Sequence, residues 1–444
     1  MPLHEAASKR ITRPSTSRPQ ERWRDMSDGL ISRSIFFDPS VYQDELTRIF
    51  ARCWLFLGHA SQIRKSGDFI TNYMGEDPVV LLRDPAGRVR AFLNSCRHRG
   101  MRICRTDHGN ARLFRCPFHG WTYATDGSLV AVPSMAEVYG DRLDTSRLGL
   151  HEVPRVTEYG GLIFGNWDAD AVSLDEYLGE FRWYLDLILT LGANWEILPG
   201  HQRYVLSANW KIAAENFAGD SYHIPFSHGS LWRLNIREVN PVNFHSSPAL
   251  RTATFANGHG LNGVGLDGER YDADLRLARD MGAEVVDYVE DCHRRLGALS
   301  KQHQKVHSFA FGNVFPNFSL NNFSALRPFG LYLWHPKGPT KLEAWQWCAV
   351  DAGAPKAVRD IVRTDFARVQ AISGLAAQDD TENFEQVTEA TRGVVGQRLD
   401  FNYQMGLGAF ETETIDGFPG RFGPYYSEQG QRNFYNAWAD WMGR

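Results

Sequence analysis

Cys96-Arg97-His98 and Cys116-Pro117-Phe118-His119 are the two stretches that decide the fold of this chain. Each supplies one cysteine and one histidine, and seventeen residues separate His98 from Cys116. Two thiolates and two imidazoles can close a tetrahedral zinc site, or hold a [2Fe–2S] cluster with cysteines on one iron and histidines on the other. Mixed zinc sites usually pair Cys with Cys and His with His. One of each in two similar loops therefore favours the cluster.

The residues around these four side chains resemble the cluster loops of Rieske oxygenases. The resemblance rests on Arg97, on Arg99-Gly100 and on the run Cys116-Pro117-Phe118-His119-Gly120-Trp121. A further cysteine, Cys104, lies between the loops and is expected to be a buried thiol rather than a ligand. The resemblance implies that a Rieske [2Fe–2S] cluster is bound by Cys96, His98, Cys116 and His119.

Length and composition narrow the class of protein. With 444 residues the chain is too long for an electron-carrying Rieske module alone. It has no run of eighteen apolar residues, and residues 1–24 form a polar arm without the apolar core of a signal peptide. The net charge of −4 and the absence of a long basic block give no support for nucleic-acid binding. Six scattered cysteines do not make a disulfide scaffold. We therefore expect a cytoplasmic protein that binds neither membrane nor nucleic acid.

Two domains of an α+β protein follow from the pattern along the chain. Short strands and turn sequences, such as Asp84-Pro85-Ala86-Gly87 and Asp126-Gly127, predict a small all-β Rieske domain over residues 55–170. Residues 171–444 are predicted to form a larger catalytic domain, with an antiparallel or mixed sheet covered by helices. Residues 306–348 favour the sheet, and an amphipathic helix is expected after Pro355. The N-terminal residues 1–54 are assigned to the catalytic domain.

A second candidate site lies in residues 209–228. Asn209 can cap a helix that ends near Gly219, and His223 and His228 follow at a spacing of five. Five residues do not fall on one helical face, so the two histidines converge only if the backbone bends, as Pro225 would encourage. Without a third partner, one buried and one exposed histidine is an equally good interpretation.

A candidate for a third metal ligand is the pair Asp379-Asp380, two adjacent carboxylates at the start of a predicted helix. One interpretation is an acidic helix N-terminus that is favoured by the helix dipole. The other is that one carboxylate joins the two imidazoles in a 2-His-1-carboxylate triad. Such a triad leaves coordination positions open on Fe(II) for O₂ and substrate.

Residues 215–228, together with Gln378-Asp379-Asp380, resemble the iron motif of the large (alpha) subunits of aromatic-ring-hydroxylating dioxygenases. The resemblance implies that Asp220 bridges a Rieske histidine of one subunit and an iron-ligand histidine of its neighbour, and that Asn216 lies near the iron. Arg327 is either a pocket residue that pairs with a substrate carboxylate or a surface residue. The implied iron ligands are His223, His228 and Asp380, and the implied pocket residues are Phe217, Ile224 and Arg327.

The resemblance implies the terminal oxygenase of a multicomponent dioxygenase, an oxidoreductase of aromatic hydrocarbon catabolism that converts an arene and O₂ to a cis-dihydrodiol. Its implied partners are a small (beta) subunit in a three-alpha three-beta hexamer, with a trimer of large subunits as the alternative. Its implied electron donors are a ferredoxin and a reductase, or one reductase with both cofactors. A monooxygenase of an aromatic acid is the alternative, and an electron carrier or redox sensor is the rival from another class. The letters G-x-G-x-x-G at residues 258–263 run into further glycines rather than a helix, so they indicate no nucleotide domain.

Overall fold

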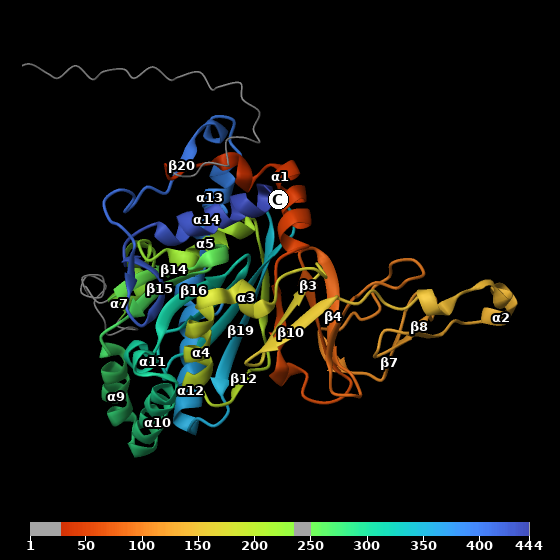
Figure 1. Ribbon diagram of the computed structural model, residues 1–444, viewed down its shortest axis with the longest axis horizontal. Helices are drawn as coiled ribbons and strands as arrows, with labels where there is room; N and C mark the ends of the chain where they lie inside the picture. The colour runs from red at the N-terminus through yellow and green to blue at the C-terminus, as the bar shows by residue number, and fades with distance from the viewer. Residues whose placement is uncertain (1–27, 235–249, 444) are drawn as a thin grey trace, which may run out of the picture.

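A computed structural model of the protein describes residues 28–234 and 250–443. A large body of sheet and helices carries a smaller β region that projects to one side (Figure 1). The predicted arm at residues 1–24 lies outside the described part of the chain. Among the described residues, no helix is both long and apolar enough to span a membrane.

The projecting region is built from short antiparallel strands, as the sequence predicts. Its four-stranded sheet has the order β5-β4-β3-β6, and its three-stranded sheet has the order β7-β8-β9. Both predicted turns are confirmed, and Gly87 and Gly127 provide their positive φ of 81° and 88°. The strands are β3 (Asp68–Met74), β4 (Asp77–Arg83), β5 (Val89–Leu93), β6 (His108–Asn110), β7 (Leu113–Arg115), β8 (Thr122–Ala124) and β9 (Leu129–Ala131).

A third small sheet anchors this region to the large body. It consists of β2 (Leu55–His59), β10 (Arg155–Tyr159) and β11 (Leu162–Asn166) in the order β10-β11-β2. Phe56 of β2 stacks on Phe318 of the large sheet, with ring centroids 4.2 Å apart. Residues of β2 and β11 therefore belong to the same hydrophobic core as the large body.

The large body is organised by one ten-stranded sheet in which every strand pair is antiparallel. Its central strands come from the predicted sheet segment and are buried on both faces. The residues that match G-x-G-x-x-G enter strand β15 (Gly260–Gly265) of this sheet and do not themselves form a strand-to-helix loop. The expectation that no helix follows the glycines is wrong, because α9 (Glu269–Met281) begins directly after Gly268. The strands are β12 (Trp195–Ile197), β13 (Gln202–Leu206), β14 (Leu250–Thr254), β15 (Gly260–Gly265), β16 (Phe309–Val314), β17 (Phe318–Asn322), β18 (Phe329–Pro336), β19 (Leu342–Asp351), β21 (Glu413–Ile415) and β22 (Phe418–Pro424).

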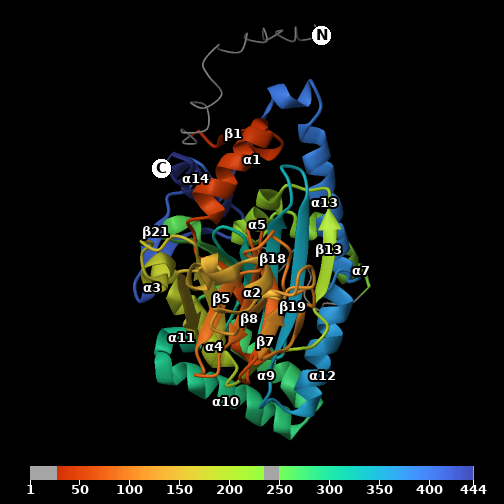
Figure 2. The same ribbon diagram turned by 90° about the vertical axis from the view of Figure 1, so that its right-hand side faces the viewer.

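Helices cover the sheet, and two groups of them position the site. Helix α5 (Trp210–Gly219) contacts β15 and β16 on one side and α14 (Gln429–Gly443) on the other. Helix α12 (Lys356–Asp365) is the predicted amphipathic helix, and α13 (Leu375–Thr391) continues along the same side of the molecule, near β13 (Figure 2). The other principal helices are α1 (Pro39–Glu45), α3 (Leu174–Leu178), α4 (Arg182–Leu191), α9 (Glu269–Met281), α10 (Ala283–Leu299) and α11 (Lys301–Val306).

A buried histidine makes the stability of this body dependent on pH. His259 is fully buried; its Nε2 donates to the carbonyl of Tyr177 (2.9 Å) and its Nδ1 accepts from the backbone N–H of Phe315 (3.0 Å). Burial lowers its pKa from 6.5 to about 4. The unfolded chain therefore binds more protons between these values, and stability falls as the pH falls through this window. We expect the titration of His259 to lower the free energy of unfolding by about 2 kcal/mol when the pH falls from 7 to 5.

The measurement is urea unfolding at pH 7 and pH 5 for the wild type and for His259→Gln, which cannot titrate in this range. The variant should lose less stability than the wild type on acidification, whatever its stability at pH 7. Equal losses in the two proteins would show that His259 does not set this slope.

Candidate active site

Helix α5 supplies the first part of the candidate site. Its predicted cap is confirmed, because the side chain of Asn209 accepts a hydrogen bond from the backbone N–H of Lys211 (3.0 Å). The helix ends at Gly219, where a side-chain Cβ would come within 2.8 Å of the Cα of Gly430. Only glycine fits this close approach, and the chain leaves the helix at Asp220.

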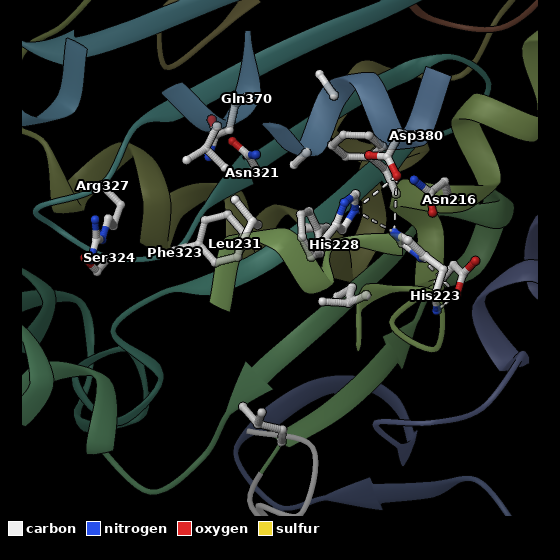
Figure 3. A pocket seen from close by; sticks show the side chains of 18 of the residues that line it. Asn216, His223, His228, Leu231, Asn321, Phe323, Ser324, Arg327, Gln370 and Asp380 are labelled. Atoms are coloured by element: carbon white, nitrogen blue, oxygen red, sulfur yellow. Dashed lines mark hydrogen bonds and ion pairs between the residues drawn. The ribbon is translucent and has the colours of Figure 1, made fainter. Parts of the chain in front are cut away.

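His223, His228 and Asp380 converge at one point (Figure 3). The short helix α6 (Ile224–Ser227), with Pro225 in its first turn, separates the two histidines and gives the predicted bend. The Nε2 atoms of His223 and His228 are 3.2 Å apart, and they lie 3.4 and 3.1 Å from Oδ1 of Asp380. Among residues 28–234 and 250–443, this is the one group of three or more His, Cys, Asp or Glu residues whose ligand atoms all lie within 4.8 Å of one another.

Each of the two imidazoles has a further carboxylate beside its other ring nitrogen, Nδ1. Oδ1 of Asp220 lies 3.3 Å from Nδ1 of His223, and Oδ2 of Asp379 lies 3.3 Å from Nδ1 of His228. A carboxylate at Nδ1 fixes the tautomer that leaves Nε2 free to bind a metal. Helix α13 begins at Leu375, so Asp379 and Asp380 lie beyond its first turn. The helix-dipole interpretation of these two residues is therefore wrong.

The charges of the triad fit a bound cation. Burial alone would raise the pKa of Asp380, but His228 and His223 bring it far below its ordinary range. Burial alone would lower the pKa of His223, but Asp220 and Asp380 together raise it to about 10. Both shifts mean that these groups stabilise positive charge at their centre. A divalent metal ion held by two imidazoles and one carboxylate would provide that charge.

A cavity of about 890 Å³ opens beside the triad. The expected pocket residues Phe217, Ile224 and Arg327 all line it, as does Asn216. Arg327 stands at the end away from the triad in Figure 3 and is ion-paired with Asp365 at 3.5 Å. Its guanidinium is therefore already engaged by a carboxylate of the protein itself.

Several cavity residues escape prediction from the sequence. The segment from residue 317 to 336 contributes Asn321, Tyr332 and Trp334. No local motif marks which of its residues face the cavity, because that depends on strand register. Other residues that line the cavity and that the sequence does not reveal are Phe323 and Ser324 of the same segment, and Tyr204, Leu231, Gln346 and Gln370 elsewhere.

The two cysteine-histidine stretches form loops with the same backbone pattern. In the first loop, the N–H of Cys96 donates to Met101 and its carbonyl accepts from Gly100. In the second loop, the N–H of Cys116 donates to Trp121 and its carbonyl accepts from Gly120. Both glycines have positive φ, 75° and 73°. Equivalent loops of this kind can present one thiolate and one imidazole each from two sides.

Burial in these loops differs between the two kinds of side chain. Cys96 and Cys116 are buried, whereas the rings of His98 and His119 are half-buried, with centroids 4.5 Å apart. Nδ1 of His98 is buried and has no hydrogen-bond partner in the described part of the chain. Two buried thiols and an unpartnered imidazole nitrogen fit the ligands of a [2Fe–2S] cluster. The thiol of Cys104 instead contacts Thr106, 3.7 Å from its hydroxyl.

Within one chain, the two sites lie far apart. The strands β7 and β8, which flank the second cysteine-histidine loop, lie at one end of the molecule in Figure 1. Helices α5 and α7 (Gly229–Arg233), which bracket the two histidines of the triad, lie on the opposite side.

Tyr123 is positioned to tune a cluster in the loops. Its hydroxyl accepts from the N–H of Arg97 (3.0 Å), which leaves its own proton to be donated to Sγ of Cys96 (3.2 Å). A hydrogen bond to a ligand sulfur stabilises the more negative, reduced cluster and raises its reduction potential. We expect Tyr123→Phe to lower the potential by about 50 mV, the equivalent of about 1 kcal/mol for one electron.

Protein-film voltammetry or a redox titration followed by electron paramagnetic resonance would measure this shift. Tyr139→Phe is the matched control, because Tyr139 belongs to the same region but no hydrogen bond joins its hydroxyl to Cys96 in the described residues. Equal potentials for wild type and Tyr123→Phe would contradict the assignment.

Comparisons with known proteins cover both sites. The model of the Rieske [2Fe-2S] domain matches residues 53–152, and the model of the ring hydroxylating alpha subunit (catalytic domain) matches residues 174–444. Over 429 residues, the chain is 39% identical to subunit alpha of biphenyl 2,3-dioxygenase from Rhodococcus jostii strain RHA1, covering 94% of this chain and 90% of that protein. It is 38% identical to subunit alpha of benzene 1,2-dioxygenase from Pseudomonas putida, covering 94% and 92%. Naphthalene 1,2-dioxygenase from Rhodococcus sp., bound to indole, matches with a TM-score of 0.83 and 36% identity, covering 95% of this chain and 97% of that one.

Proposed function

Because this chain belongs to the family of ring-hydroxylating alpha subunits, we propose that it adds both atoms of O₂ to an aromatic ring and gives a cis-dihydrodiol. The enzyme is an oxidoreductase with a Rieske [2Fe–2S] cluster and a mononuclear iron. The observation that carries the proposal is the convergence of His223, His228 and Asp380 at the wall of a large cavity with aromatic lining.

In this proposal the chain's own residues hold the two iron groups and place the substrate. The cluster supplies single electrons and the mononuclear iron activates O₂ beside the substrate ring. Asp220 and Asp379 orient the two imidazoles, so that each directs Nε2 to the metal. The metal ligands are His223, His228 and Asp380, and the cluster ligands are Cys96, His98, Cys116 and His119.

The walls of the cavity favour a flat aromatic substrate. Phe217 and Trp334 lie against one another with ring centroids 5.7 Å apart, and Phe384 meets Trp334 edge-on at 6.2 Å. All three line the cavity, and Phe384 is on the same helix as Asp380. Substrate contacts with such rings are apolar and position the ring mainly by shape.

Electron transfer between neighbouring subunits belongs to the same proposal. In Figure 1 the strands beside the cluster loops project at one end of the molecule, and the helices that bracket the triad lie in the large body on the opposite side, so a route within the chain is long. Oδ1 of Asp220 lies 3.3 Å from Nδ1 of His223, and the side chain of Asp220 is one-third exposed (33%), which leaves it open to contact from a cluster histidine of a neighbouring subunit. We place three alpha subunits in a ring, accompanied by a small (beta) subunit and supplied with electrons by a ferredoxin and a reductase.

Mixed subunits test this electron route. Cys116→Ser removes a cluster ligand and His228→Ala removes a metal ligand, so each variant alone should be inactive. Co-assembled chains of both kinds should recover part of the activity, because an intact cluster then faces an intact triad in some pairs. No recovery in assemblies that demonstrably contain both chains would contradict the intersubunit route.

The reaction is tested by mass spectrometry of products from the electron-supplied protein, offered a panel of arenes and aryl acids under ¹⁸O₂. A cis-diol with two labels is the expected product. Phenols with a single label as the only products would move the enzyme to the monooxygenases. With both iron sites loaded, a protein that converts no member of the panel would contradict the proposal as it stands.

A further inference from the structure

A row of polar side chains crosses four neighbouring strands where the cavity meets the sheet. Tyr332 of β18 lies directly opposite Gln346 of β19. Tyr204 of β13 is opposite Ala344, two residues from Gln346, and Asn321 of β17 is opposite Gly330, two residues from Tyr332. Residues that face each other, or stand two apart, share one face of a sheet. All four therefore point to the same side, and all four line the cavity.

Hydrogen bonds within this row leave two polar atoms unused. Asn321 Nδ2 donates to the hydroxyl of Tyr332 (3.2 Å), which donates to Oε1 of Gln370 (3.4 Å). Gln346 Nε2 donates to the hydroxyl of Tyr204 (2.7 Å). Among the described residues, neither Nε2 of Gln370 nor Oε1 of Gln346 has a partner. The exposed fractions of these two glutamines are only 6% and 2%.

Buried donors and acceptors without partners are unfavourable, and a binding site is one reason to keep them. Gln370 offers a donor and Gln346 an acceptor, and neither carries charge. Tyr332 connects the two, since it bonds to Gln370 and is the direct cross-strand neighbour of Gln346. A ligand group that matches them must offer an acceptor and a donor side by side and must itself be neutral.

The position of the two glutamines relative to the triad suggests how such a ligand would lie. Figure 3 shows Asn321 and Gln370 between Arg327 and the triad. The aromatic wall of Phe217, Trp334 and Phe384 borders the same cavity. A ring held by this wall would therefore carry its polar group toward Gln370, whose partner Tyr332 lies opposite Gln346 in the sheet.

A carboxylate fits this part of the cavity poorly. It has no donor for Oε1 of Gln346, and carboxylates outnumber guanidinium groups in the cavity lining. Arg327, the candidate partner for an acidic substrate, is engaged by Asp365. Like charge in the walls and the missing donor both weaken binding of an aryl acid.

We propose that Gln370 and Gln346 form a subsite for a neutral secondary amide, so that the preferred substrate is an arene bearing a –CO–NH– group. The carbonyl accepts from Nε2 of Gln370, and the N–H donates to Oε1 of Gln346. A flip of both glutamines together exchanges the free donor and the free acceptor, and a secondary amide that lies in the reverse direction still matches both. The inference rests on the proposed function, because it takes the cavity beside the triad as the substrate site.

Benzanilide and trans-stilbene are a suitable pair of probes, because CH=CH replaces CO–NH between the same two rings. Dissociation constants are measured without reductant, by quenching of the intrinsic tryptophan fluorescence and by calorimetry, on the full protein with both iron centres loaded. We expect benzanilide to bind the wild type at least about tenfold more tightly than trans-stilbene. Equal affinities for the two ligands would overturn the subsite without any variant.

Three variants assign the effect to residues. Gln370→Leu and Gln346→Leu should each weaken benzanilide binding about tenfold and leave trans-stilbene binding unchanged or tighter. Gln386→Leu is the control, since Gln386 is a surface glutamine of α13 that bonds to Glu382. Equal weakening of both ligands by the two cavity variants would indicate a change in cavity shape and would overturn the proposal.

Turnover separates this inference from the proposed function. If the wild type dihydroxylates trans-stilbene but binds both probes equally, the subsite is wrong and the proposed function stands. If benzanilide binds through both glutamines and no arene is oxidised by the electron-supplied protein, the subsite stands and the proposed function is wrong.

Discussion

Replacement of Asp380 by alanine is expected to lower oxygenation of any substrate by at least about 1,000-fold, the equivalent of about 4 kcal/mol. Its Oδ1 is the atom on which both Nε2 atoms converge, at 3.4 and 3.1 Å. Two neutral imidazoles alone would hold a divalent ion weakly, because no coordinating carboxylate would balance the positive charge of the ion. The direct measurement is iron per chain, which should fall from about three to about two while the visible spectrum of the cluster stays unchanged.

Asp379→Asn is the matched control at the neighbouring position. Asp379 approaches His228 at Nδ1, on the side away from the triad's centre. The variant loses only the charge that orients one imidazole, so we expect a loss of about 10- to 100-fold in iron affinity or activity. If Asp379→Asn lost the iron and Asp380→Ala kept it, the roles that we assign to the two carboxylates would have to be exchanged.

Lys211→Met is expected to lower the free energy of unfolding by about 3–5 kcal/mol, because it would leave the buried carboxylate of Glu45 without its counter-charge. Lys211 and Glu45 are both fully buried, and Nζ lies 2.5 Å from Oε1. Glu45 also accepts from the indole N–H groups of Trp210 (2.9 Å) and Trp438 (2.8 Å). This carboxylate therefore joins α1, α5 and α14 in one network.

The double variant Lys211→Met with Glu45→Gln distinguishes the effect of the unpaired charge from the effect of the lost side-chain packing. A neutral amide at position 45 removes the unpaired charge and still accepts from one indole. Its NH₂ group faces the other indole N–H, so only part of the lost stability should return. Urea unfolding, followed by circular dichroism and by tryptophan fluorescence, compares the four proteins of the cycle. A loss below about 1 kcal/mol in the single variant would contradict the expected cost of an unpaired buried charge. Since α5 also carries Asn216 and Phe217, iron content should be measured alongside.

Features with a local cause are the ones that the sequence predicts well. The cap at Asn209, the end of α5 at Gly219 and the turn at Gly127 each depend on a few neighbouring residues. The cysteine-histidine loops are equally local, because each closes on itself through hydrogen bonds between residues at most five apart. The bend between His223 and His228 follows from one proline in a short helix.

Features that depend on strand register or on where a helix begins could not be predicted from the sequence. The polar row of Tyr204, Gln346, Tyr332 and Asn321 exists only because four strands from distant parts of the chain align in one register. The contacts of Asp379 and Asp380 follow from where α13 begins, one turn earlier than the predicted start. A helix turns by about 100° per residue, so the two neighbouring carboxylates reach opposite sides of His228.

The separation of the two iron sites within one chain has a consequence for how activity depends on protein concentration. In the proposed ring, each active unit consists of the cluster of one subunit and the triad of its neighbour. An isolated chain has one of each but cannot pair them. Dilution below the concentration at which the subunits associate would then abolish activity, although every chain would keep its metals. A chain with both sites damaged would inactivate two active units, one through its cluster as electron donor and one through its triad as electron acceptor. A minority of damaged subunits would therefore inactivate a larger share of the sites.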